Sequence, residues 1–301
     1  MRKLIPAALA AALFIAACVI KPPDFAASPA AHSQGTADLQ LVRLAYIPAP
    51  PPAPPAPTAP DPDDITAFSH YIHPNAERYA AYISENPELD LQIAVAYVNA
   101  GLDVAFFEDI IDITVPQDWL VLVNKRHSLD KAYVPSDLRP ALGSNQQLRT
   151  AAALALERMA EQMKQEGMRL FLRSGYRSYN TQRSLYYRPT SSDRYNARPG
   201  LSEHQTGLAA DVVQMYTSAK IGTLRFEKTP QYEWLLQNAY RYGFILRYPK
   251  EYTNITGYSY EPWHWRYVGI HAATKMHSEG VATLEEYYGR YLITPVPVPG
   301  K

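Results

Sequence analysis

The sequence of 301 residues is poor in cysteine, carries no net charge and shows no internal repeat. Cys18 is its single cysteine, so no disulfide can form within one chain. Lys and Arg together number 29, and so do Asp and Glu, which leaves no charge excess and no basic patch for nucleic acid. The composition therefore excludes a disulfide-stapled fold and gives no support to nucleic-acid binding.

The N-terminus combines two basic residues, an apolar core and the cysteine. The apolar run Leu4–Ala17 is shorter than a membrane span and is typical of a signal peptide. Ile15-Ala16-Ala17-Cys18 resembles a bacterial lipobox. We expect residues 1–17 to be a signal peptide and Cys18 to carry a lipid anchor, which would hold the protein outside the cytoplasm on a bacterial cell membrane. The alternative is an ordinary cleaved signal peptide with a chance cysteine.

Pro and Ala dominate the segment that follows, up to residue 63. Such a segment cannot build a core, so residues 18–63 are interpreted as the lipidated cysteine and a linker. In a polyproline II conformation, about 3.1 Å per residue, it could reach on the order of 100 Å. A Pro-rich recognition motif is the alternative. Leu39–Ile47 interrupts the segment and could be a transient strand or dock on the following domain.

The remaining chain, residues 64–301, is long enough for one domain, with a catalytic core at about 120–280. Helical and strand-like stretches alternate along it, which predicts an α+β fold: an antiparallel sheet carrying a metal site, flanked by helices, with a helical N-terminal preface. Helices are expected over residues 76–84, 91–98, 146–166, 178–187 and 230–242, and strands over 119–123, 168–172, 208–213, 244–248 and 264–268.

Two pairs of residues carry the most chemical information: His204 with Asp211, and Glu261 with His264. Two imidazoles and a carboxylate can hold a zinc ion that keeps one position open for water, and a second carboxylate nearby can serve as the general base. The combination predicts a zinc hydrolase.

Asp211 gives a physical reason to expect an ion. It interrupts an apolar strand, where an unpaired carboxylate would be costly. A metal held jointly by Asp211, by His204 on the preceding turn and by His264 on a second strand removes that cost. Residues 261 and 264 would point to opposite faces of a straight strand, but Pro262 favours a kink or chain reversal that brings them together.

These segments resemble the VanY-type zinc D,D-carboxypeptidases and L,D-carboxypeptidases, which are cell-wall enzymes. The signature of that family is Ser-x-His-x-x-Gly-x-Ala-x-Asp followed by Glu-x-Trp-His, and the resemblance extends over roughly residues 85–280. Every fixed position of the signature is matched: Ser202, His204, Gly207, Ala209, Asp211, Glu261, Trp263 and His264.

The resemblance implies zinc binding by His204, Asp211 and His264, with Glu261 as the catalytic base. The implied activity is removal of a C-terminal D-Ala from peptidoglycan stem peptides, with Zn²⁺ as the cofactor. Two bonds fit it: D-Ala-D-Ala in a pentapeptide, or the bond from L-Lys or diaminopimelate to D-Ala in a tetrapeptide. Pocket depth decides between them, and the motif does not encode it.

Arg177 and Gln182 lie in a segment, residues 174–182, that resembles the family's Tyr-Arg-Ser segment, where the arginine and the glutamine face substrate. A guanidinium suits a bidentate grip on the substrate's terminal carboxylate. It could instead stabilise the oxyanion of the tetrahedral intermediate or form a structural salt bridge. Arg173 and Arg198 are further candidates for the carboxylate grip.

Ser202 and Trp263, together with Gln182, are expected to position substrate or to support the ligands from outside. The loops over residues 187–199 and 216–228 are expected to form the walls of the pocket. The histidines outside the motifs, and most of the scattered tyrosines, are interpreted as structural or surface residues; these histidines are His70, His73, His127, His271 and His277.

A second class of function fits the same ligands: a non-catalytic, zinc-containing module that binds cell-wall peptide. Glu261 favours the enzyme, because a binding module needs no base beside an open zinc position. We expect the protein to act as a monomer on a peptidoglycan stem peptide.

Overall fold

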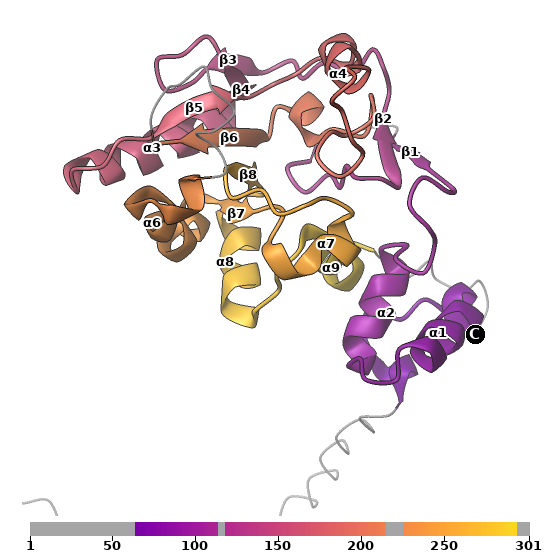
Figure 1. Cartoon of the computed structure of the whole chain (residues 1–301). Coiled ribbons are helices and arrows are strands. Elements are labelled where there is room, and N and C mark those ends of the chain that lie inside the picture. Colours follow the sequence, from indigo (N-terminus) through magenta and orange to yellow (C-terminus); the bar gives the residue numbers. More distant parts are fainter. Residues whose placement is uncertain (1–63, 114–117, 215–224, 294–301) are drawn as a thin grey trace, which may run out of the picture. The chain divides into compact units, whose positions relative to one another are not determined.

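The computed structural model describes residues 64–113, 118–214 and 225–293, which combine helices with antiparallel sheets (Figure 1). The expected signal peptide, Cys18 and the linker with Leu39–Ile47 lie outside these residues, as does most of the loop over residues 216–228. No helix among the described residues is long and apolar enough to cross a membrane.

The five predicted helices and four of the five predicted strands are present, together with helices and strands that were not predicted. The α-helices are α1 (Ala76–Glu85), α2 (Leu91–Asn99), α3 (Thr150–Gln165), α4 (Tyr179–Tyr186), α6 (Pro230–Asn238), α7 (Thr253–Thr256), α8 (Ile270–Glu279) and α9 (Leu284–Tyr291). The strands are β1 (Ile111–Ile113), β2 (His127–Leu129), β3 (Leu138–Pro140), β4 (Gln147–Arg149), β5 (Phe171–Ser174), β6 (Ala209–Val213), β7 (Phe244–Leu246) and β8 (His264–Tyr267).

Four strands form the central antiparallel sheet, in the order β5-β6-β8-β7. Two smaller pairs stand apart from it, β1 with β2 in parallel and β3 with β4 antiparallel. Because side chains alternate across a strand, the central sheet has one apolar and one polar face.

The apolar face lies against α3 and α6. Leu156 and Met159 of α3 share a fully buried cluster with Leu172, Val212 and Trp265 of the sheet. Each such side chain contributes roughly 1.5–3 kcal/mol by leaving water. The core therefore fixes which face of the sheet is left for polar residues.

The polar face carries Asp211, His264 and Arg266. Asp211 of β6 lies directly opposite His264 of β8 in the register of the sheet. Directly opposed residues of an antiparallel pair have Cβ atoms about 4.5–5.5 Å apart. The pairing of β6 with β8 alone thus brings an aspartate and a histidine into contact range.

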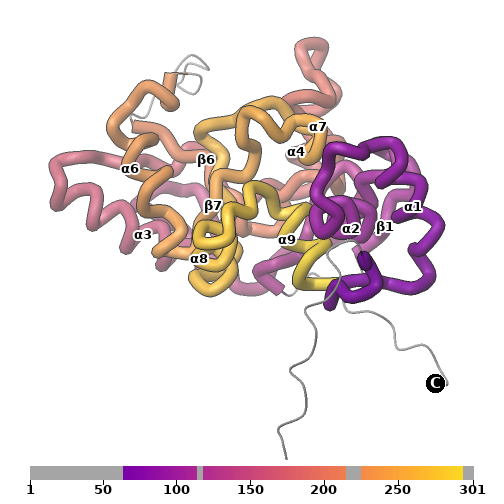
Figure 2. Tube along the Cα trace, turned by 90° about the horizontal axis from the view of Figure 1, so that it is seen from below, coloured from indigo at the N-terminus to yellow at the C-terminus, as the bar shows by residue number. Residues whose placement is uncertain are grey.

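Helices α1 and α2 fall on the two N-terminal stretches with helical spacing. Helix α2 packs against α9, the last helix of the described sequence (Figure 2). The approach is close: a Cβ placed on Gly289 of α9 would lie 1.9 Å from the carbonyl oxygen of Ala96. The two helices touch through their backbones at this position.

The strand expected at residues 119–123 was a wrong prediction. The segment makes a turn and an irregular stretch with no strand partner among the described residues. Instead of bonding to a neighbouring strand, the carbonyl oxygens of Trp119 and Val121 accept hydrogen bonds from the Arg266 guanidinium, at 2.9 and 2.7 Å. The helix expected from residue 146 begins instead at Thr150, because Gln147–Arg149 pair with β3.

Candidate metal and active site

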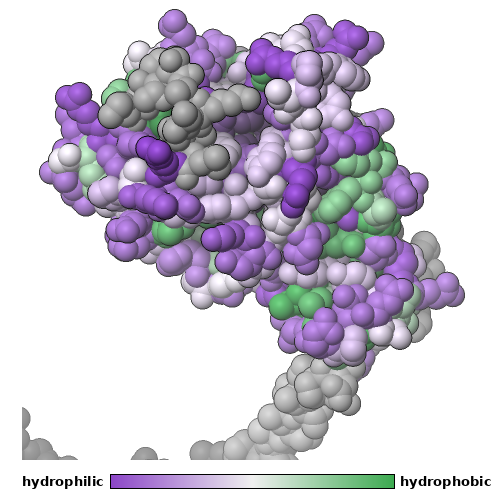
Figure 3. Space-filling model, in the orientation of Figure 1, coloured by the Kyte–Doolittle hydropathy of each residue, from purple (hydrophilic) through white to green (hydrophobic). Residues whose placement is uncertain are grey.

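A cavity of about 600 Å³ opens on the polar face of the sheet. This volume lies in the range of sites for small molecules and short peptide ends. Part of its wall comes from the loop over residues 187–199, as expected, through Thr190, Tyr195, Asn196 and Ala197. Most residues on the face of the domain in Figure 3 are hydrophilic, with small groups of hydrophobic residues between them.

His204 lies on a 3-10 turn, η3 (Glu203–Thr206), which Gly207 ends. Gly207 has a φ of 69°, a conformation that glycine adopts without strain, and a Cβ there would lie 2.8 Å from Leu138. The His204 Nδ1 lies 2.7 Å from the Gly175 carbonyl oxygen, which can accept a hydrogen bond only from a protonated nitrogen. The Nε2 of His204 is thereby left facing Asp211.

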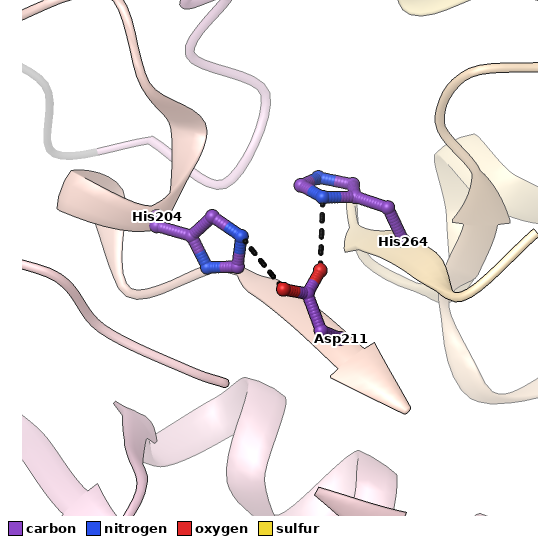
Figure 4. Close-up of side chains that lie close together, drawn as sticks. All are labelled: His204, Asp211 and His264. Carbon is purple, nitrogen blue, oxygen red and sulfur yellow. Dashed lines mark ion pairs between the residues drawn. The ribbon is translucent and has the colours of Figure 1, made fainter. Parts of the chain in front are cut away.

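Asp211 lies between the two imidazoles (Figure 4). Its Oδ2 is 3.4 Å from His204 Nε2, and its Oδ1 is 3.1 Å from His264 Nδ1. The side chains come from η3, β6 and the first residue of β8, and all three point toward one another.

The three side chains fit a metal ion. Their ligand atoms lie within 4.8 Å of one another. In a tetrahedral zinc site with bonds of about 2.0–2.1 Å, ligand atoms are roughly 3.3 Å apart, close to both measured separations. The Asp211 Oδ1 is buried and has no hydrogen-bond partner among the residues that the structure describes, even though His264 Nδ1 is near. Two nitrogens and a carboxylate oxygen are donors that suit Zn²⁺.

Glu261 joins the group through a chain reversal. The His264 N–H donates to the Glu261 carbonyl oxygen at 3.0 Å, so the turn expected around Pro262 is present. The Glu261 Oε2 lies 3.7 Å from His264 Nδ1. Burial raises the pKa of Glu261 to about 8, although the neighbouring His264 opposes the shift. A carboxylate with such a pKa is suited to accept a proton near neutral pH.

The charges of Asp211 and His264 support each other. Burial alone would lower the pKa of His264, but the neighbouring carboxylates of Asp211 and Glu203 outweigh it and raise the pKa to about 9. Burial alone would raise the pKa of Asp211, but the two histidines hold it well below its usual range. Asp211 is therefore an anion, as a metal ligand must be.

Arg177 reaches the same group from the segment after β5. Its Nη2 lies 3.9 Å from Asp211 Oδ2 and donates to Ser174 Oγ at 3.0 Å. Its Nη1 donates to Gln182 Oε1 at 2.7 Å, and the Gln182 amide donates in turn to the Ala197 carbonyl at 2.6 Å. Gln182 is buried and is not among the described residues that line the cavity, and its side chain bonds Arg177 and Ala197 instead.

The two other candidate arginines differ in their surroundings. Arg173 lines the cavity at a bulge of β5, where the register with β6 shifts between Leu172 and Ser174. Bulges re-aim side chains in this way beside many active sites. Among the described residues, Arg173 has no ion-pair partner, whereas Arg198 is paired with Asp193 at 3.0 Å.

Ser202 and Trp263 line the cavity, and so do residues that the sequence did not single out, among them Glu203, Tyr248 and Tyr258. Glu203 stands inside the signature, in one of its variable positions, so the motif gave it no weight. The structure shows that Glu203 is a charged residue in a buried turn. The histidines outside the motifs lie outside the metal-binding group found among the described residues.

Comparison with known proteins agrees with this geometry. Residues 145–270 match the family model described as VanY, D-alanyl-D-alanine carboxypeptidase. YodJ of Bacillus subtilis (strain 168), named as a carboxypeptidase, is 40% identical over 208 residues, which cover 62% of this chain and 76% of YodJ. A D-alanyl-D-alanine carboxypeptidase of Enterococcus faecalis is 33% identical over 188 residues, covering 57% of this chain and 66% of that protein. The solved structure of the LdcB LD-carboxypeptidase superposes with a TM-score of 0.53 at 38% identity, covering 61% of this chain and 91% of LdcB.

Proposed function

The chain belongs to the VanY family of D-alanyl-D-alanine carboxypeptidases, and on that premise we propose that it is a zinc metallopeptidase that removes a C-terminal D-Ala from peptidoglycan stem peptides. The observation that carries the proposal is the convergence of His204, Asp211 and His264, with Glu261 beside them, in a cavity of peptide size.

His204, Asp211 and His264 would hold the Zn²⁺ ion. When bound, the ion would supply an open position for a water molecule whose pKa it lowers to about 7. Glu261 would be the base that takes a proton from the attacking water, since its Oε2 lies 3.7 Å from His264 Nδ1 and its raised pKa suits the transfer. The same carboxyl could then return the proton to the amine of the departing D-Ala.

Arg177 is proposed to stabilise the oxyanion of the tetrahedral intermediate. The support is that its Nη2 is 3.9 Å from Asp211 Oδ2, so the guanidinium would lie beside the carbonyl of a peptide bound at these side chains. Gln182 and Ser174 fix its orientation before substrate arrives. Arg173, which lines the cavity without an ion-pair partner among the described residues, is proposed to hold the substrate's terminal carboxylate, with Ser202 and Trp263 positioning the peptide.

The names of the relatives cover both candidate bonds, since one is a D-alanyl-D-alanine carboxypeptidase and another an LD-carboxypeptidase. Purified protein should be incubated with tetrapeptide and pentapeptide muropeptides, and the products weighed by mass spectrometry. Loss of a single D-Ala from the pentapeptide indicates D,D-specificity, and loss from the tetrapeptide indicates L,D-specificity.

Replacement of Glu261 tests catalysis directly. Glu261→Gln keeps the shape and removes the base, so zinc content should stay near one ion per chain while turnover falls about a hundredfold or more. Glu88→Gln, at an exposed position, is the matched control and should behave like the wild type. A wild-type protein that binds zinc and wall peptide but releases no D-Ala would instead identify the non-catalytic binding module.

We further propose that residues 1–17 are a signal peptide, that Cys18 is acylated, and that residues 18–63 form a linker to a monomeric carboxypeptidase domain, residues 64–301, in which α1 and α2 are a preface to the catalytic core. The support is the lipobox-like sequence and the change of composition after Cys18. The enzyme would then work outside the cytoplasm on a tether from the bacterial cell membrane.

A further inference from the structure

Glu203 is a fully buried carboxylate directly beside the metal-binding group. Its Oε2 lies 3.5 Å from His264 Nε2, the ring nitrogen on the far side from Asp211. Neither atom is exposed, and neither has a hydrogen-bond partner among the described residues. Within the part of the chain that the structure describes, these two buried polar atoms face each other, at a distance that a small shift would convert into a hydrogen bond.

The second oxygen of Glu203 is fully engaged. Its Oε1 accepts from Arg247 Nε at 2.7 Å and from Arg266 Nη1 at 2.6 Å. Arg247 also holds Glu285 of α9 through two hydrogen bonds, at 2.9 and 2.7 Å. All four side chains are fully buried. The two arginines thus fix the carboxylate of Glu203 in place and direct its free oxygen at the His264 ring.

The two histidines are held from outside by different groups. His204 has the Gly175 carbonyl oxygen at Nδ1, which leaves Nε2 for the ion. His264 presents Nδ1 to Asp211 and Glu261, so its Nε2 must carry the proton when Nδ1 binds a metal. A carboxylate beside that proton fixes the tautomer, orients the ring and raises the basicity of the ligand nitrogen.

We propose that Glu203 is a positioning residue for the metal site: it accepts the Nε2 proton of His264 and so holds Nδ1 as the ligand atom. The proposal rests on the proposed zinc function and deepens it. Arg247 and Arg266, which both donate to its Oε1, keep Glu203 charged and in place.

Glu203→Gln tests the proposal, with Glu285→Gln as the matched control. Both variants remove one buried carboxylate from the same arginine cluster, but only Glu203 touches His264. Zinc affinity should be measured by competition with a chelator, and thermal stability of the metal-free proteins alongside. We expect both variants to be less stable, and only Glu203→Gln to lose about 10–100-fold in zinc affinity. Nitrogen-15 spectra of the zinc-loaded wild type should show the His264 proton on Nε2.

Equal zinc affinities in the two variants would overturn the proposal, and so would a His264 proton found on Nδ1. If Glu203→Gln fails to fold, Glu203→Asp is the second variant. It keeps the charge but is one methylene too short to reach both the arginines and His264, so it should show the same loss of zinc affinity. Wild-type zinc affinity in Glu203→Asp would also overturn the proposal. A wild-type protein that binds no zinc would instead contradict the proposed function itself.

Discussion

Single residues of this protein differ in how readily the sequence revealed them. His204, Asp211, Glu261 and His264 are encoded in the motif spacing, and the structure brings all four together. Glu203 escaped notice because its importance comes from a contact with a residue far along the chain, which no local pattern records. Charged pairs between residues far apart in the sequence, such as Glu203 with Arg247 and His264, cannot be predicted from a single sequence.

The division of roles between two arginines is testable at this scale. Arg177→Lys leaves a charge but loses the planar fork, so kcat should fall roughly 10–100-fold for a free-acid peptide and for its C-terminal amide alike. Arg173→Lys should mainly raise KM for the free acid and leave the amide unchanged. Steady-state kinetics on the matched pair of peptides gives both results.

The opposite pattern, with discrimination between acid and amide lost in Arg177→Lys, would assign the carboxylate grip to Arg177. Unchanged kinetics in that variant on both peptides would mark it as a structural residue held by Gln182 and Ser174.

Helices and strands were predictable where periodicity and capping residues coincide. Ser178 accepts from the Thr181 N–H and begins α4 where it was expected, and the apolar spacing of α3 faces the core. The strand prediction over residues 119–123 failed because Leu122 and Val123 are buried with no strand partner among the described residues, while Trp119 is 41% exposed. The bulge at Arg173 could not be foreseen, since it depends on how β5 meets β6.

The packing of α2 on α9 gives a prediction in which two effects have opposite signs. Alanine normally stabilises a helix interior by about 1 kcal/mol relative to glycine. At Gly289 the added methyl would collide with the Ala96 carbonyl, so Gly289→Ala should lower the free energy of unfolding by about 1–3 kcal/mol. Urea unfolding followed by circular dichroism measures the difference. A stabilised variant would mean that α2 does not rest on α9 in solution.

At the scale of the whole molecule, each face of one sheet has a separate role. The apolar face packs against α3, and the polar face carries His264 and Asp211, which are proposed to bind zinc, with Glu203 beside them. The same register of β6 and β8 serves both, because alternate residues of a strand point to opposite faces. A one-residue slip of β8 would turn His264 into the core and abolish the site.

The proposed anchor predicts where the intact protein is found. If Cys18 is acylated, the wild type should fractionate with membranes and incorporate labelled fatty acid, because an acyl chain buries apolar surface that a soluble domain cannot hide. Cys18→Ser removes the acceptor thiol and should release the protein or leave it unprocessed, without label. Ser28→Ala, in the adjoining linker, is the control and should remain with the membrane. The detergent-extracted wild type and the released Cys18→Ser variant should have the same carboxypeptidase activity, since the proposed lipid lies outside residues 64–301. Wild-type protein found wholly in the soluble fraction would refute the anchor and leave the proposed chemistry intact.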